Sequence, residues 1–164
     1  MKVFVRSRHL AGYLAIDGEL DPAPLLERAR AMGKRVYLPV LAGNPAAHLL
    51  FAPYHLDMAM QANRFGILEP DVPAADLLLP QHLDLVLTPL VAFDLHGTRL
   101  GMGGGFYDRT FAFRHNPAHL PRPLLLGLAY ELQKVAELPR QSWDIPLDGI
   151  VTEQALYPGP GGLE

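Results

Sequence analysis

The chain has 164 residues, of which 49% are hydrophobic and 19% are charged, so its composition excludes intrinsic disorder and favours one domain with its own core. Its net charge of −3 excludes broad attraction to polyanions, and we expect neither nucleic acid nor membrane as a partner. The chain has no cysteine, which excludes a thiolate nucleophile, a disulfide and a cysteine zinc site. With no secretory or membrane-spanning apolar run, we expect a cytoplasmic protein that is a monomer or weak oligomer.

The first third of the chain predicts a strand, a helix and a second strand. Residues 9–16 are apolar enough for a buried strand, and a turn follows at residues 17–18. A helix is expected from residue 21, with apolar residues at helical spacing and Gly33 as its stop. Residues 34–40 form the next strand. This βαβ unit is expected to be parallel and right-handed.

The rest of the chain carries further apolar runs that predict strands. They are residues 48–52, 83–88, 124–129 and 149–152, the last of these as an edge strand. Residues 57–65 are either helical or irregular, and the tail over 158–164 is expected to fray. Strands that alternate with helices predict an α/β fold with three α/β/α layers and a mostly parallel sheet, all within a single domain over 1–164. Ligands of such sheets bind at the carboxyl ends of the strands.

Residues 99–108, with the sequence RLGMGGGFYD, are the most informative stretch. Gly101, Gly103, Gly104 and Gly105 allow positive φ and close approach of the backbone to a ligand. An apolar run precedes them and a predicted helix over 106–113 follows, so backbone N–H groups and a positive helix end would meet at one point. An anion site is one interpretation, and a tight turn is the other. The stretch matches neither a P-loop nor a GxGxxG dinucleotide fingerprint.

Charged residues near this stretch have both functional and structural interpretations. Arg99 has the fork geometry that suits phosphate oxygens. Asp108 is either a Mg²⁺ ligand or an acidic residue favoured in the first turn of a helix. Glu19 follows the first strand, where it either accepts hydrogen bonds from a ligand or lies in a solvated turn. Asp144 and Asp148 either reach a metal or cap turns.

Aromatic residues offer a further candidate surface. Phe65 and the pair Phe106 and Tyr107 either stack on a planar ring or belong to the core. The sequence contains no recognisable Ser/His/Asp arrangement.

In combination, these residues resemble a known family. The stretch DLVLTPLVAFDLHGTRLGMGGGFYDR, residues 84–109, is similar to the signature of the 5-formyltetrahydrofolate cyclo-ligase (5,10-methenyltetrahydrofolate synthetase) family. The resemblance extends to YLAIDGELD, GKRVYLPV, LLF, FGILEP and WDIPLDGIVT, and so covers nearly the whole chain. It implies a three-layer fold of the NagB/RpiA/CoA-transferase type.

The resemblance also implies an activity: the ATP- and Mg²⁺-dependent conversion of 5-formyltetrahydrofolate to 5,10-methenyltetrahydrofolate, with release of ADP and phosphate. The residues it implies for ATP are Arg99, Leu100, Gly101, Met102, Gly103, Gly104, Gly105, Phe106 and Tyr107. Those it implies for the folate are Leu14, Glu19, Phe65, Met102, Gly103, Gly104, Gly105 and Phe106. Asp108 and Asp144 would serve Mg²⁺.

Two departures from the family pattern leave alternatives open. Some members carry a basic residue in the glycine stretch, where this chain has Met102 and Gly104. Members usually begin with a basic, ATP-binding helix, whereas Lys2, Arg6 and Arg8 lie too close to the first strand to form that whole helix. Either the start is misplaced or trimmed, or the chain is a weakened or inactive form. A non-catalytic folate- or nucleotide-binding module, or an isomerase or acyl-transferring enzyme on the same fold, are the alternative functions.

Overall fold

A computed structural model describes residues 2–43, 46–116, 118, 122–160 and 163, and one large sheet forms its centre. The strands of this sheet are β1 (His9–Ala11), β2 (Arg35–Gly43), β3 (Ala46–Pro53), β6 (Leu85–Thr88), β9 (Leu124–Leu128), β10 (Gly149–Val151) and β11 (Leu156–Pro158). Their spatial order is β11-β10-β9-β6-β1-β2-β3. Neighbours from β10 to β2 run parallel, and the outer strands β11 and β3 run antiparallel to theirs. The mostly parallel sheet is confirmed.

The predicted βαβ unit is present, but its first strand is shorter than expected. Helix α2 (Ala23–Ala31) joins β1 to β2 and buries Leu26 and Ala29. Gly33 ends it with a φ of 76°. The prediction of a strand up to residue 16 is wrong, because β1 ends at Ala11. At Gly12 an added Cβ would lie 2.6 Å from Leu26 Cδ2, so the backbone here packs directly against α2.

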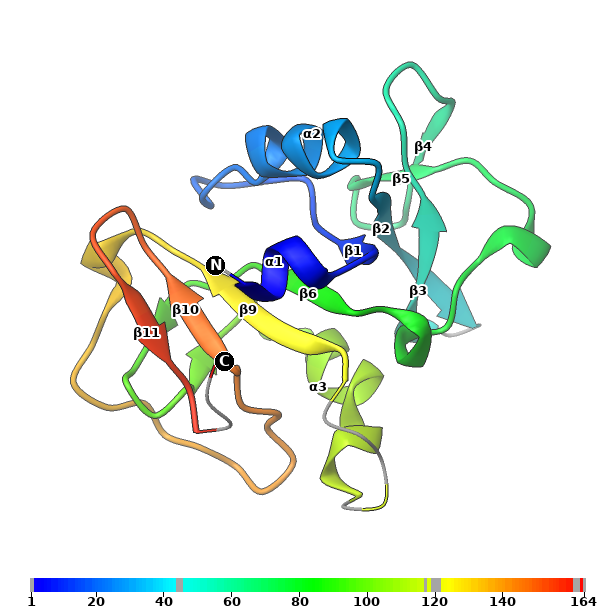
Figure 1. The fold of residues 1–164 in the computed structure, drawn as a ribbon. Coiled ribbons are helices and arrows are strands. Elements are labelled where there is room, and N and C mark those ends of the chain that lie inside the picture. The colour runs from blue at the N-terminus through cyan, green and yellow to red at the C-terminus, as the bar shows by residue number, and fades with distance from the viewer. Residues whose placement is uncertain (1, 44–45, 117, 119–121, 161–162, 164) are drawn as a thin grey trace.

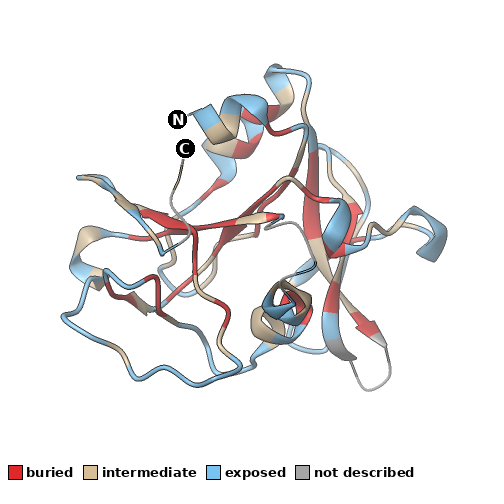
Figure 2. Cartoon of the chain, turned by 60° about the horizontal axis from the view of Figure 1, so that its bottom comes forward, coloured by how far each residue is buried: buried red, intermediate tan, exposed pale blue. Residues whose placement is uncertain are grey.

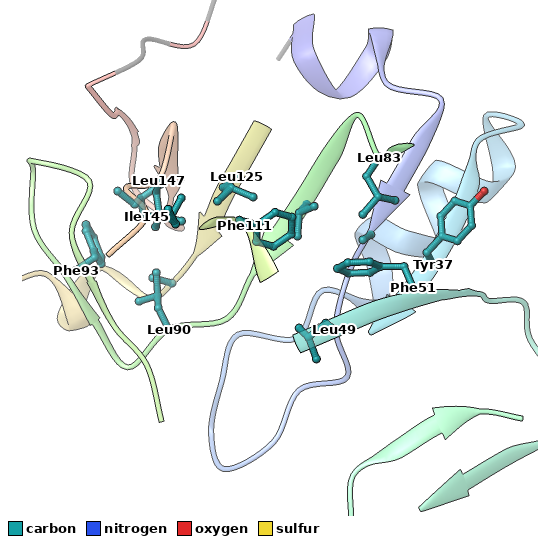
Figure 3. Packing of buried hydrophobic residues seen from close by; sticks show 14 residues of the cluster. Tyr37, Leu49, Phe51, Leu83, Leu90, Phe93, Phe111, Leu125, Ile145 and Leu147 are labelled. Atoms are coloured by element: carbon teal, nitrogen blue, oxygen red, sulfur yellow. The ribbon is translucent and has the colours of Figure 1, made fainter. Parts of the chain in front are cut away.

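Helices cover both faces of the sheet. Short helix α1 (Lys2–Arg6) and α2 lie on one side, and α3 (Phe106–Thr110) lies on the other (Figure 1). Side chains of β6 alternate between two cores, because Leu85 packs with the α2 side and Val86 with the α3 side. The second core includes Phe111 (Figure 3). Buried residues run along the central strands (Figure 2), and the three-layer α/β/α prediction is confirmed.

Residues 57–65, expected to be helical or irregular, contain no helix: they are irregular apart from β4 (Met60–Ala62), the first strand of a hairpin. Strand β4 and the second strand, β5 (Leu68–Pro70), form a separate two-stranded sheet. The turn is built by Asn63, whose Oδ1 accepts hydrogen bonds from the N–H groups of Phe65 at 2.9 Å and Ile67 at 3.1 Å. Gly66 completes it with a φ of 76°. Local turn chemistry therefore decides this structure.

The C-terminal half differs from the prediction in two details. The strand at residues 149–152 is confirmed as β10, but it is not at the edge, since β11 pairs with it antiparallel. The predicted helix over 106–113 leaves α-helical geometry after Thr110 and continues as a short 3₁₀ turn. The other 3₁₀ turns are η1 (Ala74–Asp76), η2 (Pro80–His82) and η4 (Glu131–Gln133), while η3 is Ala112–His115.

The predicted strands over 48–52, 83–88 and 124–129 are confirmed as β3, β6 and β9. Of the tail expected to fray, residues 161, 162 and 164 lie outside the described part. Pro158 ends β11, and the Gly159 N–H donates to the Asp148 carbonyl at 2.8 Å. In the described ranges, no helix combines the length and apolar character needed to cross a membrane.

Candidate active site

A cavity of about 430 Å³ opens at the carboxyl ends of the central strands. Leu14 follows β1 in the chain, Pro39 lies in β2 and Pro89 follows β6, and all three line the cavity. From β1 the chain crosses to β2 on one side, while β6 lies on the other side of β1. The cavity thus sits where the strand order reverses, the place at which open α/β sheets bind ligands.

The sequence-predicted site residues come together in this one cavity. Those that line it are Leu14, Glu19, Phe65, Arg99, Leu100, Gly101, Met102, Gly103, Gly104, Gly105, Phe106, Tyr107, Asp108 and Asp144. Asp148, the other metal candidate, does not line it. Its carboxylate accepts hydrogen bonds from Arg114 Nη2 and, at 2.7 Å, from the Leu125 N–H. Asp148 therefore has a structural role, although it pairs with Arg114 and a β9 N–H instead of capping a turn.

The glycine segment, residues 101–105, is held between a small hairpin and α3. Strand β8 (Arg99–Leu100), which pairs with β7 (Ala92–Phe93), directly precedes it. The expected buried strand, β6, ends well before it. The hairpin turn is organised by buried Asp94, whose Oδ1 accepts from the N–H groups of His96 and Thr98 and whose Oδ2 accepts from that of Leu138.

The glycine segment itself is exposed and open. Gly103 has a φ of 89° and Gly105 a φ of 63°, values at which a side chain would be strained. Nothing lies within 4 Å of a Cβ added at Gly101. Since α3 has only five residues, its dipole is small, and the exposed backbone is the main feature that could receive an anion.

Arg99 faces inward rather than toward solvent. Its side chain is 7% exposed, and its Nη1 donates to the Ile145 carbonyl at 2.6 Å. Its Nη2 donates to Asp108 Oδ1 at 2.9 Å, and the same oxygen accepts from the Ile145 N–H at 2.9 Å. Arg99 and Asp108 thereby fasten the glycine segment to the loop before Ile145.

The two carboxylates predicted for a metal each keep one uncommitted oxygen. Asp108 uses Oδ1 as described, and Asp144 uses Oδ2 to accept from the Gln141 N–H at 2.7 Å. Neither Asp108 Oδ2 nor Asp144 Oδ1 is hydrogen-bonded to a described residue. Among the described residues, no group of three or more His, Cys, Asp or Glu side chains forms a metal site. A divalent cation here would need further ligands from a bound molecule or water.

A polar corner of the cavity combines Glu19 with two tyrosines. Glu19 Oε2 accepts one hydrogen bond, from the Ile16 N–H at 3.1 Å. Burial raises the pKa of the Glu19 carboxyl above its ordinary value, and the nearby charge of Asp17 adds to this. Burial likewise raises the pKa of Tyr13 and of Tyr107, and the charge of Glu19 contributes in both cases.

Another part of the cavity lining is apolar and aromatic. Phe65 is 57% exposed and meets Phe106 edge to face, with ring centroids 6.0 Å apart. The guanidinium of Arg109 lies over the Phe106 ring at 4.9 Å. Met102 and Trp143 are also largely exposed at the cavity. Exposed aromatic faces of this kind suit a flat ring system.

Sequence reasoning did not identify several lining residues, among them Tyr13, Asn63, Glu69 and Trp143. Glu69 is the least expected, since it is a carboxylate that is only 7% exposed. In the sequence, the feature that could have identified Asn63 and Glu69 as site residues is their place in or beside the FGILEP stretch. For Tyr13 and Trp143, it was their place in the stretches YLAIDGELD and WDIPLDGIVT.

Comparisons with known proteins identify the family of this chain. The family described as 5-formyltetrahydrofolate cyclo-ligase matches residues 1–153. The 5-formyltetrahydrofolate cyclo-ligase of Escherichia coli K12 is 45% identical over 153 residues, which cover 93% of this chain and 82% of the relative. That of Haemophilus influenzae is 43% identical, covering 89% and 76%.

Among solved structures, the 5,10-methenyltetrahydrofolate synthetase of Aquifex aeolicus superposes with a TM-score of 0.76 and 32% identity, covering 99% of this chain and 82% of that one. The resemblance seen in the glycine segment thus extends over sequence and fold together. The chain belongs to the 5-formyltetrahydrofolate cyclo-ligase family.

Proposed function

We propose that this protein converts 5-formyltetrahydrofolate to 5,10-methenyltetrahydrofolate, using ATP and Mg²⁺ and releasing ADP and phosphate. The observation that carries the proposal is the convergence of the glycine segment, Glu19, Phe65, Asp108 and Asp144 in one cavity of a chain from this family. The volume of about 430 Å³ falls in the range of small-molecule sites.

The reaction requires activation of a poor leaving group. The formyl oxygen attacks the γ-phosphate of ATP and ADP departs. N10 of the folate then attacks the activated carbon, and the ring closes as phosphate and the N10 proton leave. Such a sequence needs positioned reactants and neutralised charge, and no protein nucleophile. A chain without cysteine meets that requirement.

We assign the two reactants to different groups of residues in the cavity lining. The exposed backbone of residues 101–105 receives ATP phosphates, and Arg99 holds that segment in place. Phe65 and Phe106 receive the flat ring of the folate, while Glu19 accepts hydrogen bonds from its N–H groups. Because Gly105 directly precedes Phe106, the glycine segment would touch both reactants.

Asp108 and Asp144 fit a magnesium ion shared with ATP. Each carboxylate has one oxygen that is not bonded to a described residue, and Mg²⁺ takes one or two carboxylates together with substrate phosphates. When bound, the ion would neutralise charge on the phosphates. The Ile145 N–H and Arg99 orient the Asp108 carboxylate for this role.

The test is formation of 5,10-methenyltetrahydrofolate, followed by its absorbance, with 5-formyltetrahydrofolate, ATP and Mg²⁺. We expect product only when all three are present. Absence of product from the folded chain would reject the enzymatic function, and folate binding without product would support the non-catalytic module instead.

The proposal includes one domain over all 164 residues and a monomer or weak oligomer that acts in the cytoplasm. The composition, with its balanced charge and lack of cysteine, supports these assignments. Sedimentation velocity tests the oligomeric state directly: a species of about 18 kDa, alone or in rapid exchange with a small oligomer, is expected.

A further inference from the structure

Glu69 is a nearly buried carboxylate in the cavity lining to which the proposed reaction gives no role. It lies in β5, its residue is 7% exposed, and it contributes to the wall of the cavity. Its Oε1 accepts two hydrogen bonds, one from the Leu41 N–H at 2.9 Å and one from Asn63 Nδ2 at 2.8 Å. A carboxylate is rarely so enclosed unless it is paired, and here both of its partners are neutral.

The first partner, Leu41, lies where β2 extends past its neighbour in the sheet. Strand β1 pairs with β2 only as far as Tyr37. On the other side, Leu41 is opposite Leu49 of β3, whose own N–H donates to Thr110 Oγ1 at 2.8 Å. The pairing with β1 ends before Leu41, and the Glu69 carboxylate accepts the hydrogen bond from the Leu41 N–H instead. This bond connects the β4–β5 hairpin to the main sheet.

The second partner, Asn63, carries that connection to the hairpin turn. While its Nδ2 donates to Glu69, its Oδ1 accepts from the N–H groups of Phe65 and Ile67. One side chain thus links the buried carboxylate to the backbone of Phe65. The Phe65 ring in turn meets Phe106, beside the glycine segment.

We propose that Glu69 is a positioning residue, which anchors the β4–β5 hairpin to β2 and thereby holds Phe65 in the cavity wall against the flat ring of the substrate. This inference rests on the proposed function, because it takes a reduced folate as the ligand. Small misplacement of a positioning wall weakens binding strongly, and about tenfold is expected when the anchor is lost.

Two variants remove the anchor by different routes. Glu69→Leu removes the acceptor of both hydrogen bonds. Asn63→Asp keeps the oxygen that accepts from Phe65 and Ile67, but it removes the Nδ2 donor and places a second carboxylate against Glu69. Glu69→Gln is the conservative rescue, because its amide oxygen can accept the same two hydrogen bonds. Ala59→Asp, at an exposed position just before β4, is the matched control for added charge.

Two measurements are made on each protein above pH 7. Hydrogen exchange without ligand reports whether amides of residues 60–69 lose protection. Binding of 5-formyltetrahydrofolate is followed by fluorescence of Trp143, the single tryptophan, which lines the cavity. We expect faster exchange and about tenfold weaker binding in Glu69→Leu and Asn63→Asp, with wild-type behaviour in Glu69→Gln and Ala59→Asp.

Wild-type affinity in Glu69→Leu or in Asn63→Asp would overturn the proposal, as would unchanged exchange of the hairpin in both. Equal weakening in Glu69→Gln and Glu69→Leu would also overturn it, because the charge itself would then contact the ligand. If the wild-type protein binds the folate but makes no product, the proposed function fails while the anchor is still tested by both measurements. If the wild-type protein does not bind the folate, the role of Glu69 in substrate positioning fails as well, whatever the exchange shows.

Discussion

The cavity and the outer edge of the sheet hold the same kinds of polar group in opposite states. At the outer edge, Glu131 accepts hydrogen bonds from Lys134, from the Tyr157 hydroxyl at 2.6 Å and from the Thr152 hydroxyl at 2.8 Å. These bonds hold the pKa of the Glu131 carboxyl at about 2. The cluster ties η4 to β11, and its groups satisfy one another.

In the cavity, the carboxylate of Glu19 and the hydroxyl of Tyr107 have fewer partners. Glu19 accepts a single backbone hydrogen bond, and the Tyr107 hydroxyl makes none with the residues that the structure describes. The pKa of Glu19 moves upward, opposite to that of Glu131, because burial outweighs the bond from Ile16. The edge groups thus satisfy one another, whereas Glu19 and Tyr107 keep capacity for further hydrogen bonds. The following predictions test that difference.

The largest effect is expected from Asp108→Asn. Loss of the charge should lower turnover by about 100-fold and raise the Mg²⁺ requirement. It also weakens the pair with Arg99, at a stability loss of about 1–3 kcal/mol. Steady-state kinetics against Mg²⁺ and urea unfolding measure the two effects separately.

The matched control is Asp84→Asn. Asp84 and Asp108 have side chains that are both 25% exposed and both paired with arginine, but Asp84 accepts from Arg8 and His9 far from the cavity. The Asp84→Asn variant should therefore be less stable than the wild-type protein but keep its turnover. An equal loss of turnover in both variants would remove Asp108 from the metal site.

Gly101→Ala tests whether the open space at the glycine segment belongs to a ligand. A methyl group meets nothing there, so the free energy of unfolding should change by less than about 0.5 kcal/mol. Affinity for ATP, measured by calorimetry, should fall about tenfold because the backbone can no longer approach the phosphates. Gly97→Ala is the contrast, since its methyl would lie 2.8 Å from the Leu147 carbonyl and should lower stability. Unchanged ATP affinity in Gly101→Ala would place the nucleotide elsewhere.

Glu19→Gln should weaken folate binding several-fold without reducing stability at pH 7. Because the folded-state pKa of Glu19 is raised above 4.5, its ionisation lowers stability as pH rises from about 4.5 through the raised value. Removing the charge removes that penalty. Fluorescence titration and urea unfolding across this pH range test both parts, and a less stable variant at pH 7 would contradict the pKa argument.

Glu131→Gln should have the smallest effect on activity and act on stability alone. The folded-state pKa of about 2 lies below the ordinary 4.5, so the contribution of Glu131 is complete above pH 4.5 and is lost as pH falls toward 2. Wild-type unfolding midpoints should therefore decline over this window more steeply than those of the variant. A change in turnover at neutral pH would show that the edge is coupled to the cavity.

Much of the fold could be predicted because local pattern and tertiary packing agree there. Leu26 and Ala29 repeat at helical spacing and form the buried face of α2, and Gly33 stops the helix as expected. The first strand was overextended because nothing in an apolar run marks the point where Gly12 turns its backbone against Leu26. The β4–β5 hairpin lacks the alternation of a typical strand and depends on the side chain of Asn63.

The sequence predicts which residues line the cavity better than it predicts the contacts among them. The residues chosen from the glycine stretch and its family resemblance do line one cavity, whereas their individual roles stay predictions. Arg99 has the sequence features of a phosphate ligand, but its guanidinium bonds Asp108 at the end of the same stretch and Ile145, which is distant in sequence. Glu69 was missed for the same reason, since its partner Leu41 is brought close only by the fold.

Buried Asp94 restrains two parts of the cavity lining at once, although it does not line the cavity itself. By bonding both the β7–β8 turn and the Leu138 N–H, it couples the strand that carries Arg99 to the segment that continues toward Trp143. Two walls of the cavity are thus restrained by one carboxylate, and the conformational entropy of these loops is lost during folding. An incoming substrate would therefore meet a rim whose shape has already been set, and less of its binding energy would be consumed in ordering the protein.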